Sequence, residues 1–163
     1  MAESSTPPIA FSARISVAQV EEGHELAPKF DAEGLIPCVT TDAASGDVLM
    51  LGYMNAEALR LSIATGEAHY FSRSRRVLWR KGATSGLTQR IVEMRIDDDQ
   101  DAVWLKVAVG GSGASCHVGF KSCFYRAVPT PAADGAVTLR FVETEKTFDP
   151  KAVYGDAPNP TIL

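Results

Sequence analysis

The sequence predicts an α+β fold of short, mostly antiparallel strands with one or two helices. Short apolar and aromatic segments recur between turn-forming residues, and one longer segment has apolar residues at helical spacing with caps at both ends. The length of 163 residues suits one folded domain. We place this domain at residues 33–128, between an N-terminal arm, 1–32, and a C-terminal extension, 129–163.

The first elements follow from local patterns. The arm is polar, is expected to pack loosely and contains one candidate strand at residues 9–17. Two apolar segments, 35–40 and 48–53, flank a turn-forming Ala-Ser-Gly-Asp, and this arrangement predicts a hairpin. Asn55 is a favourable N-cap and Gly66 a favourable C-cap, so a helix is expected between them.

The remaining elements are expected to be strands. Residues 69–72 and 77–80 are short aromatic segments with a basic connector, and residues 102–109 are a strongly β-prone run that ends at a glycine-rich loop. Further strands are expected at 87–96, 124–128 and, as an edge strand of the extension, 137–142, followed by an extended tail.

The composition excludes several classes of protein. With 45% hydrophobic and 22% charged residues, the chain is typical of a globular protein rather than a disordered one. The net charge of −4 argues against binding to a nucleic-acid polymer. No apolar run approaches the roughly 20 residues of a membrane span, and the polar N-terminus lacks the layout of a signal peptide. We therefore expect a cytoplasmic protein that does not bind a membrane.

An acidic run at 97–101, Asp-Asp-Asp-Gln-Asp, is the first candidate site. Side chains alternate along an extended segment, so Asp97, Asp99 and Asp101 are expected on one face. A hard divalent ion such as Mg²⁺, which prefers oxygen ligands, would relieve their mutual repulsion. The alternative is a solvated acidic loop without an ion.

Two cysteines seven residues apart, Cys116 and Cys123, form the second candidate site. Two thiolates with an imidazole beside the first, His117, suit zinc. The alternatives are two thiols buried as small apolar side chains, or a disulfide, which is unusual in the cytosol. Cys38 lies in an apolar strand and is expected to be a core residue.

The third candidate site is basic and aromatic. Arginines, a lysine and small hydroxyl residues suit an anionic ligand, because guanidinium and backbone amide groups donate to phosphate oxygens. In an acidic chain this cluster favours a small phosphorylated molecule over a polymer. Trp79 or Tyr70 is a candidate to stack on a base, with core packing as the alternative. The candidate binding residues are Arg73, Arg75, Trp79, Arg80, Lys81 and Ser85.

Taken in order, these motifs resemble a known family, that of the phosphoribosyl-AMP cyclohydrolases of histidine biosynthesis. The resemblance covers about residues 33–128 in one unbroken order. It runs through LMLGYMN at 49–55, GEAHYFSRSR at 66–75, LWRKGATSG at 78–86, the acidic run at 97–101 and SCFYR at 122–126.

The resemblance implies an activity, two metals and an assembly. Members of the family hydrolyse the bond between N1 and carbon 6 of the purine in phosphoribosyl-AMP, as intertwined homodimers that use Zn²⁺ and Mg²⁺, with the zinc site shared between subunits. The family's magnesium aspartates match Asp97, Asp99 and Asp101, and two of its zinc cysteines match Cys116 and Cys123.

Two histidines are candidates for proton transfer in that reaction. Zinc with an open position supplies hydroxide at neutral pH, and hydroxide attack on carbon 6 requires a proton to reach N1. His117 is the expected general acid–base because it adjoins a zinc ligand, and its alternative is a hydrogen-bonded bystander. His69 is the alternative proton carrier.

This chain departs from the family pattern at two positions. The third zinc cysteine of the family sits between the first two aspartates, where this chain has Asp98. A carboxylate can bind zinc, so Asp98 is the expected third ligand. Val118 replaces a threonine. These departures leave open a paralogue that binds a nucleotide or metal without this catalysis or with altered specificity. A purine deaminase ranks last because its Cys-plus-His zinc motif with a neighbouring Glu is missing.

Overall fold

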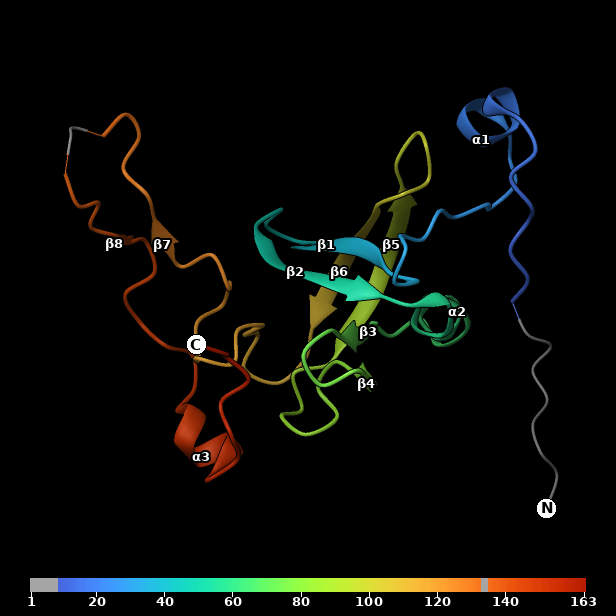
Figure 1. Ribbon diagram of the computed structural model, residues 1–163. Helices are drawn as coiled ribbons and strands as arrows, with labels where there is room; N and C mark the ends of the chain where they lie inside the picture. Colours follow the sequence, from blue (N-terminus) through green and yellow to red (C-terminus); the bar gives the residue numbers. More distant parts are fainter. Residues whose placement is uncertain (1–8, 133–134) are drawn as a thin grey trace, which may run out of the picture.

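A computed structural model describes residues 9–132 and 135–163 and shows a four-stranded sheet at the centre of the protein (Figure 1). The strand order is β2-β1-β6-β5. The pairs β1–β2 and β5–β6 are antiparallel, and β1 and β6 pair in parallel. The predicted α+β class with mostly antiparallel strands is therefore confirmed. The strands are β1 (Ile36–Asp42), β2 (Val48–Met54), β5 (Gln89–Ile96) and β6 (Val103–Val109).

A helix and a second hairpin pack beside β2. The helix, α2 (Ala56–Thr65), begins after Asn55, whose side chain accepts a hydrogen bond from the Ala58 amide at 2.8 Å. It ends at Gly66, which has a left-handed φ of 71°, as the caps predict. The hairpin pairs β3 (His69–Ser72) with β4 (Val77–Arg80). Ile36, Leu49, Met54, Leu59 and Leu105 are among the buried residues of the resulting core.

A buried polar network runs through this core. The Tyr70 hydroxyl lies 2.7 Å from the Thr40 hydroxyl and donates to Gln89 Oε1 at 2.6 Å. Gln89 Nε2 in turn donates to Ser115 Oγ at 3.2 Å. Tyr70 is 1% exposed and packs in the core, so its ring offers little surface on which a base could stack. The network also links the sheet to the loop that carries Cys116.

The N-terminal arm differs from its prediction in the described part, residues 9–32. No strand forms at 9–17 there, because Ser16 accepts a hydrogen bond from the Gln19 amide at 3.0 Å and caps a helix, α1 (Val17–Glu22). The arm is also not loosely packed. Gln100 Oε1 accepts from the Ala27 amide at 2.8 Å, and Gln100 Nε2 donates to the Val20 carbonyl at 2.9 Å.

The C-terminal extension contains more structure than predicted. The expected edge strand forms as β8 (Arg140–Phe141), which pairs with β7 (Arg126–Ala127) and not with the central sheet. These two strands form a projection of the C-terminal part of the chain that extends away from the central sheet (Figure 1). The tail was expected to be extended, but Asp149 caps a helix, α3 (Pro150–Tyr154), in the described structure. None of the described helices is long and apolar enough to cross a membrane. The cytoplasmic location stays a prediction.

Candidate functional site

A cavity of about 840 Å³ gathers most of the predicted site residues. Its walls come from β2, the β3–β4 hairpin with the loop that follows it, the loop at 115–123 and the C-terminal segment. The candidates that line it are Arg73, Arg75, Trp79, Arg80, Lys81, Ser85, His117 and Cys123.

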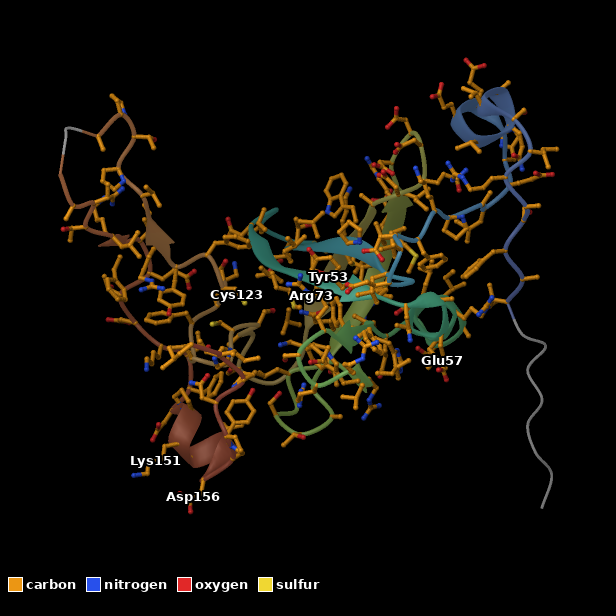
Figure 2. The ribbon with its side chains drawn as sticks, in the orientation of Figure 1. Tyr53, Glu57, Arg73, Cys123, Lys151 and Asp156 are labelled. Carbon is orange, nitrogen blue, oxygen red and sulfur yellow. The ribbon has the colours of Figure 1, made fainter. Side chains whose placement is uncertain are left out.

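The β3–β4 hairpin supplies the exposed basic groups. The Arg73 guanidinium lies 3.9 Å from the centre of the Tyr53 ring, and both side chains lie at the middle of the molecule in Figure 2. Arg75 Nε donates to the Ser72 hydroxyl at 3.4 Å. Arg80 forms a 3.1 Å ion pair with Glu67. Because these guanidinium groups are solvent-exposed, each can turn towards an anion at small energetic cost.

Lys81 lies deeper in the cavity than the arginines. Its ammonium group donates to the Ser115 carbonyl at 2.7 Å and lies 5.4 Å from the centre of the half-buried Trp79 ring. Burial lowers the pKa of Lys81, and the charges of Cys123 and Cys116 oppose that shift. Lys81 therefore places a positive charge between the aromatic wall and the two thiols.

The loop at 115–123 folds back on itself and brings the two cysteines together. The Ser115 amide donates to the Lys121 carbonyl at 2.9 Å, and the Gly119 amide donates to the Cys116 carbonyl at 3.0 Å. Cys116 is buried and Cys123 is exposed at the cavity. A hydrogen bond from the Cys123 thiol lowers the pKa of Cys116 to about 6 and raises the pKa of Cys123. The pair therefore shares one proton, which Cys123 retains and which must leave before both sulfurs can bind a metal as thiolates.

The structure separates the two candidate histidines. His117 lines the cavity, and its Nε2 is buried without a hydrogen-bond partner among the described residues. Burial lowers the pKa of His117, with a further contribution from Lys81. His69 does not line the cavity: it is 7% exposed, with Nδ1 2.8 Å from the Glu67 carbonyl and its amide donating to the Ser62 hydroxyl.

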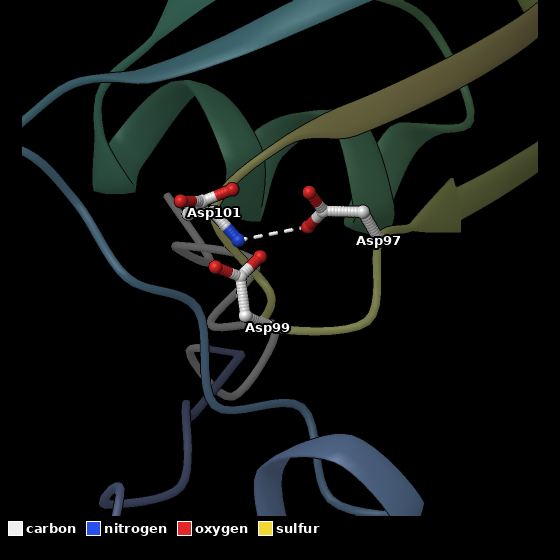
Figure 3. A group of neighbouring side chains, drawn as sticks. All are labelled: Asp97, Asp99 and Asp101. Carbon is white, nitrogen blue, oxygen red and sulfur yellow. Dashed lines mark hydrogen bonds between the residues drawn. The ribbon is translucent and has the colours of Figure 1, made fainter.

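Asp97, Asp99 and Asp101 lie close together, as predicted, but they do so in a turn and not along one face of an extended segment. Their carboxylate oxygens lie within 4.8 Å of one another (Figure 3). The segment is a turn and not an extended strand, since Gln100 has a φ of 58° and the Asp101 amide donates back to Asp97 Oδ1 at 2.9 Å. Hydrogen bonding to Asp97 and Asp99 raises the pKa of Asp101. Three hard oxygen donors at this spacing fit a divalent cation.

Asp98 and the cysteines lie far apart within one chain. Asp98 precedes β6 and lines a separate cavity of about 340 Å³ beside α1, whereas Cys116 follows the other end of β6. At about 3.3 Å per residue, the seven residues of β6 separate the two loops by roughly 20 Å. The three predicted zinc ligands therefore do not meet in a single chain.

The C-terminal segment contributes cavity residues that the sequence analysis missed. Tyr154 and Asn159 line the same cavity as His117 and Cys123. The local signal was present, because Asp149 followed by Pro150 is a typical helix start and Gly155 a typical stop. What the pattern lacked was any indication of where this helix packs.

Comparison with known proteins decides the family. Residues 50–125 match the family described as Phosphoribosyl-AMP cyclohydrolase. A protein of that name from a Bradyrhizobium species is 64% identical over 127 residues, which cover 78% of this chain and 95% of the relative. The chain belongs to the phosphoribosyl-AMP cyclohydrolase family. Proteins of the same name from Bradyrhizobium diazoefficiens and Rhodopseudomonas palustris are 61% and 62% identical, covering 83% of this chain and 94% and 90% of the relatives.

The phosphoribosyl-AMP cyclohydrolase match includes the basic hairpin, the aspartates and both cysteines of the thiol pair. It ends at residue 125, so α3 and the rest of the C-terminal segment lie outside it. The walls of the cavity thus come partly from the family domain and partly from residues beyond it.

Proposed function

We propose that the 840 Å³ cavity is the active site in which this enzyme of histidine biosynthesis hydrolyses the N1–C6 bond of the purine ring of phosphoribosyl-AMP. One observation carries the assignment: a single cavity holds an unpartnered imidazole, a cysteine of the thiol pair and a basic cluster. These are the groups that proton transfer, metal binding and phosphate binding require.

The basic cluster suits the substrate's phosphate groups. Arg73, Arg75 and Arg80 are exposed at the cavity, and Lys81 lies deeper beside Trp79. Phosphoribosyl-AMP carries a phosphate at each end and a purine between its sugars. We assign the phosphates to the guanidinium groups and the purine to the Trp79 face, because aromatic rings stack on bases.

The thiol pair fits zinc by the chemistry of its donors. Cys116 and Cys123 are soft ligands, and the lowered pKa of Cys116 favours the thiolate that zinc requires. When bound there, zinc acts as a Lewis acid that lowers the pKa of water towards about 7. His117 lines the same cavity, and its imidazole, whose Nε2 has no partner among the described residues, can take a proton from the attacking water and deliver it to N1 of the purine.

The third zinc ligand requires a second copy of the chain. Because roughly 20 Å of β6 separates Asp98 from Cys116 in one chain, we assign the third position to the partner subunit's Asp98 in a homodimer. The turn that holds Asp98 also holds Asp97, Asp99 and Asp101. Their hard oxygen donors fit Mg²⁺, which would supply positive charge for the substrate phosphates.

Turnover and zinc content of purified variants test the assignment. We expect Cys116→Ser and Cys123→Ser to lose zinc and ring opening, while Cys38→Ser, a change in the core, retains zinc. Asp98→Cys should keep zinc and Asp98→Ala should lose it. Activity that survives both cysteine changes without zinc would overturn the mechanism. Zinc-loaded wild type that binds nucleotide without opening the ring would instead support the non-catalytic paralogue, which Asp98 and Val118 motivate.

A complementation experiment tests the shared site. A chain with Asp98→Ala and a chain with Cys123→Ser are each expected to be inactive. A mixed dimer of the two contains one intact site, so a random equal mixture should recover about a quarter of wild-type activity. No recovery, with mixed dimers shown to form, would place all the zinc ligands within one subunit.

A further inference from the structure

The C-terminal segment is fixed onto the loop that carries the two cysteines. The Glu143 carboxylate accepts hydrogen bonds from the Lys121 amide at 3.0 Å and from the Ser122 amide at 3.2 Å. The Thr147 amide donates to the Gly119 carbonyl at 2.7 Å. These contacts join residues more than 20 positions apart, so they fix the segment in a defined position on the loop. We call this contact between residues 143–148 and residues 119–122 the seat of the segment.

The seat is closely packed at Gly119. This residue has a φ of 105°, which side chains other than hydrogen rarely allow, and a Cβ atom there would lie 2.6 Å from the Phe148 carbonyl oxygen. The backbones of the loop and the segment therefore approach each other too closely here for a side chain at residue 119. This contact fixes the point from which the residues after Phe148 continue.

Beyond the seat, α3 and the residues after it form a wall of the cavity. Tyr154 is half-buried, lines the cavity and packs edge-on against Phe148 with ring centres 6.2 Å apart. Asn159 lines the cavity near His117, where its amide raises the pKa of the imidazole against the effect of burial. Lys151 also lines the cavity, whereas Asp156 does not and is directed away from Cys123 and Arg73 in Figure 2.

This distribution gives the cavity two chemically different sides. The β3–β4 side carries most of the cationic side chains and can hold phosphates, whereas the C-terminal side offers an aromatic ring and an amide beside a single lysine, Lys151. A ring covers the flat face of a base or the apolar face of a ribose, and an amide both donates to and accepts from sugar hydroxyls and base edges. A nucleoside between phosphates needs this combination.

We propose that residues 150–162 are the second wall of the substrate site, in which Tyr154 and Asn159 contact the nucleoside part of the bound nucleotide and set its affinity. This proposal rests on the proposed function of the cavity. It makes the extension part of the binding machinery, although the family match ends before it.

Steady-state kinetics of the full-length, zinc-loaded enzyme test the wall. Tyr154→Ala and Asn159→Ala should each raise the KM for phosphoribosyl-AMP about tenfold, the value of one good stacking or hydrogen-bonding contact, and Tyr154→Ala, which lies away from His117 in the proposed chemistry, should change kcat little. Tyr154→Phe keeps the ring and should restore the wild-type KM. Asp156→Ala, on the same segment but outside the cavity, is the matched control and should leave KM unchanged. AMP binding measured by calorimetry should weaken in the same variants.

The outcomes separate this proposal from the function on which it rests. If wild type does not turn over phosphoribosyl-AMP, the proposed function fails. If wild type does so and neither truncation changes KM or AMP affinity, the wall is refuted. A lower KM in the truncated variants would also refute it, because the segment would then obstruct the site. Asn159 is exposed, so its truncation should not affect folding and decides the question even if Tyr154→Ala is unstable.

Discussion

Replacing Gln100 by glycine should weaken the attachment of the N-terminal arm to the turn that carries the aspartates. Gln100 is 4% exposed, and its side chain bonds the Ala27 amide and the carbonyls of Val20 and Glu25 at 2.8, 2.9 and 3.2 Å. Its φ of 58° suits glycine, so Gln100→Gly removes the three bonds without a backbone penalty.

The size of the effect follows from these contacts. Three hydrogen bonds, two of them buried, at about 1 kcal/mol each, less about 1 kcal/mol of relieved left-handed strain, give a net loss of about 2 kcal/mol. For a chain of this length the loss should lower Tm by about 4–8 °C. Circular dichroism at fixed protein and metal concentrations measures it, since both concentrations influence apparent stability.

A matched control separates the side-chain bonds from the backbone effect. Arg76 also has a positive φ, of 53°, but it is exposed in the β3–β4 turn. Arg76→Gly should relieve similar strain and leave Tm unchanged or slightly higher. If Gln100→Gly lowers Tm no more than Arg76→Gly does, the three hydrogen bonds do not hold the arm in place.

Three further predictions concern the network, the seat and a surface carboxylate. Tyr70→Phe should cost about 2–3 kcal/mol in urea unfolding, because two buried partners lose their hydrogen bond; a loss below about 0.5 kcal/mol would contradict the network. Gly119→Ala should speed proteolysis after residue 140 because its Cβ collides with Phe148, and unchanged cleavage would refute the seat. Hydrogen bonds, first that from Lys106, lower the pKa of Glu93 from its ordinary 4.5. Glu93→Gln should therefore lower the free energy of unfolding at pH 7, and this difference from wild type should disappear as the pH falls below 4.5. A difference that does not depend on pH would contradict the assignment.

The elements that local sequence determines were predicted well. The β1–β2 hairpin has its turn residues between its strands, and α2 has Asn55 and Gly66 at its ends, so neighbouring residues suffice to define both. The parallel pairing of β1 with β6 was not predicted. Its partners, such as Cys38 and Val103, lie far apart in sequence, and nothing in either strand specifies the other.

The candidate site shows the same division between local and long-range information. The spacing of Cys116 and Cys123 is local, and the structure brings both thiols together. His117 and His69 could not be separated by their sequence neighbours, because burial against α2 and exposure to the cavity depend on tertiary packing. The aspartate turn was missed because a left-handed glutamine is uncommon, and the arm that binds Gln100 precedes it by about 75 residues.

The parallel pair at the centre of the sheet has a consequence for the order of folding. The β1–β2 hairpin and α2 need only contacts close in sequence, so we expect them to form early, also during synthesis. Val103, Leu105 and Val107, which complete the core, lie on β6 and are made some 60 residues later. Until β6 emerges, β1 exposes an unpaired edge beside a half-built core. The nascent chain is therefore most prone to aggregation before β6 is made.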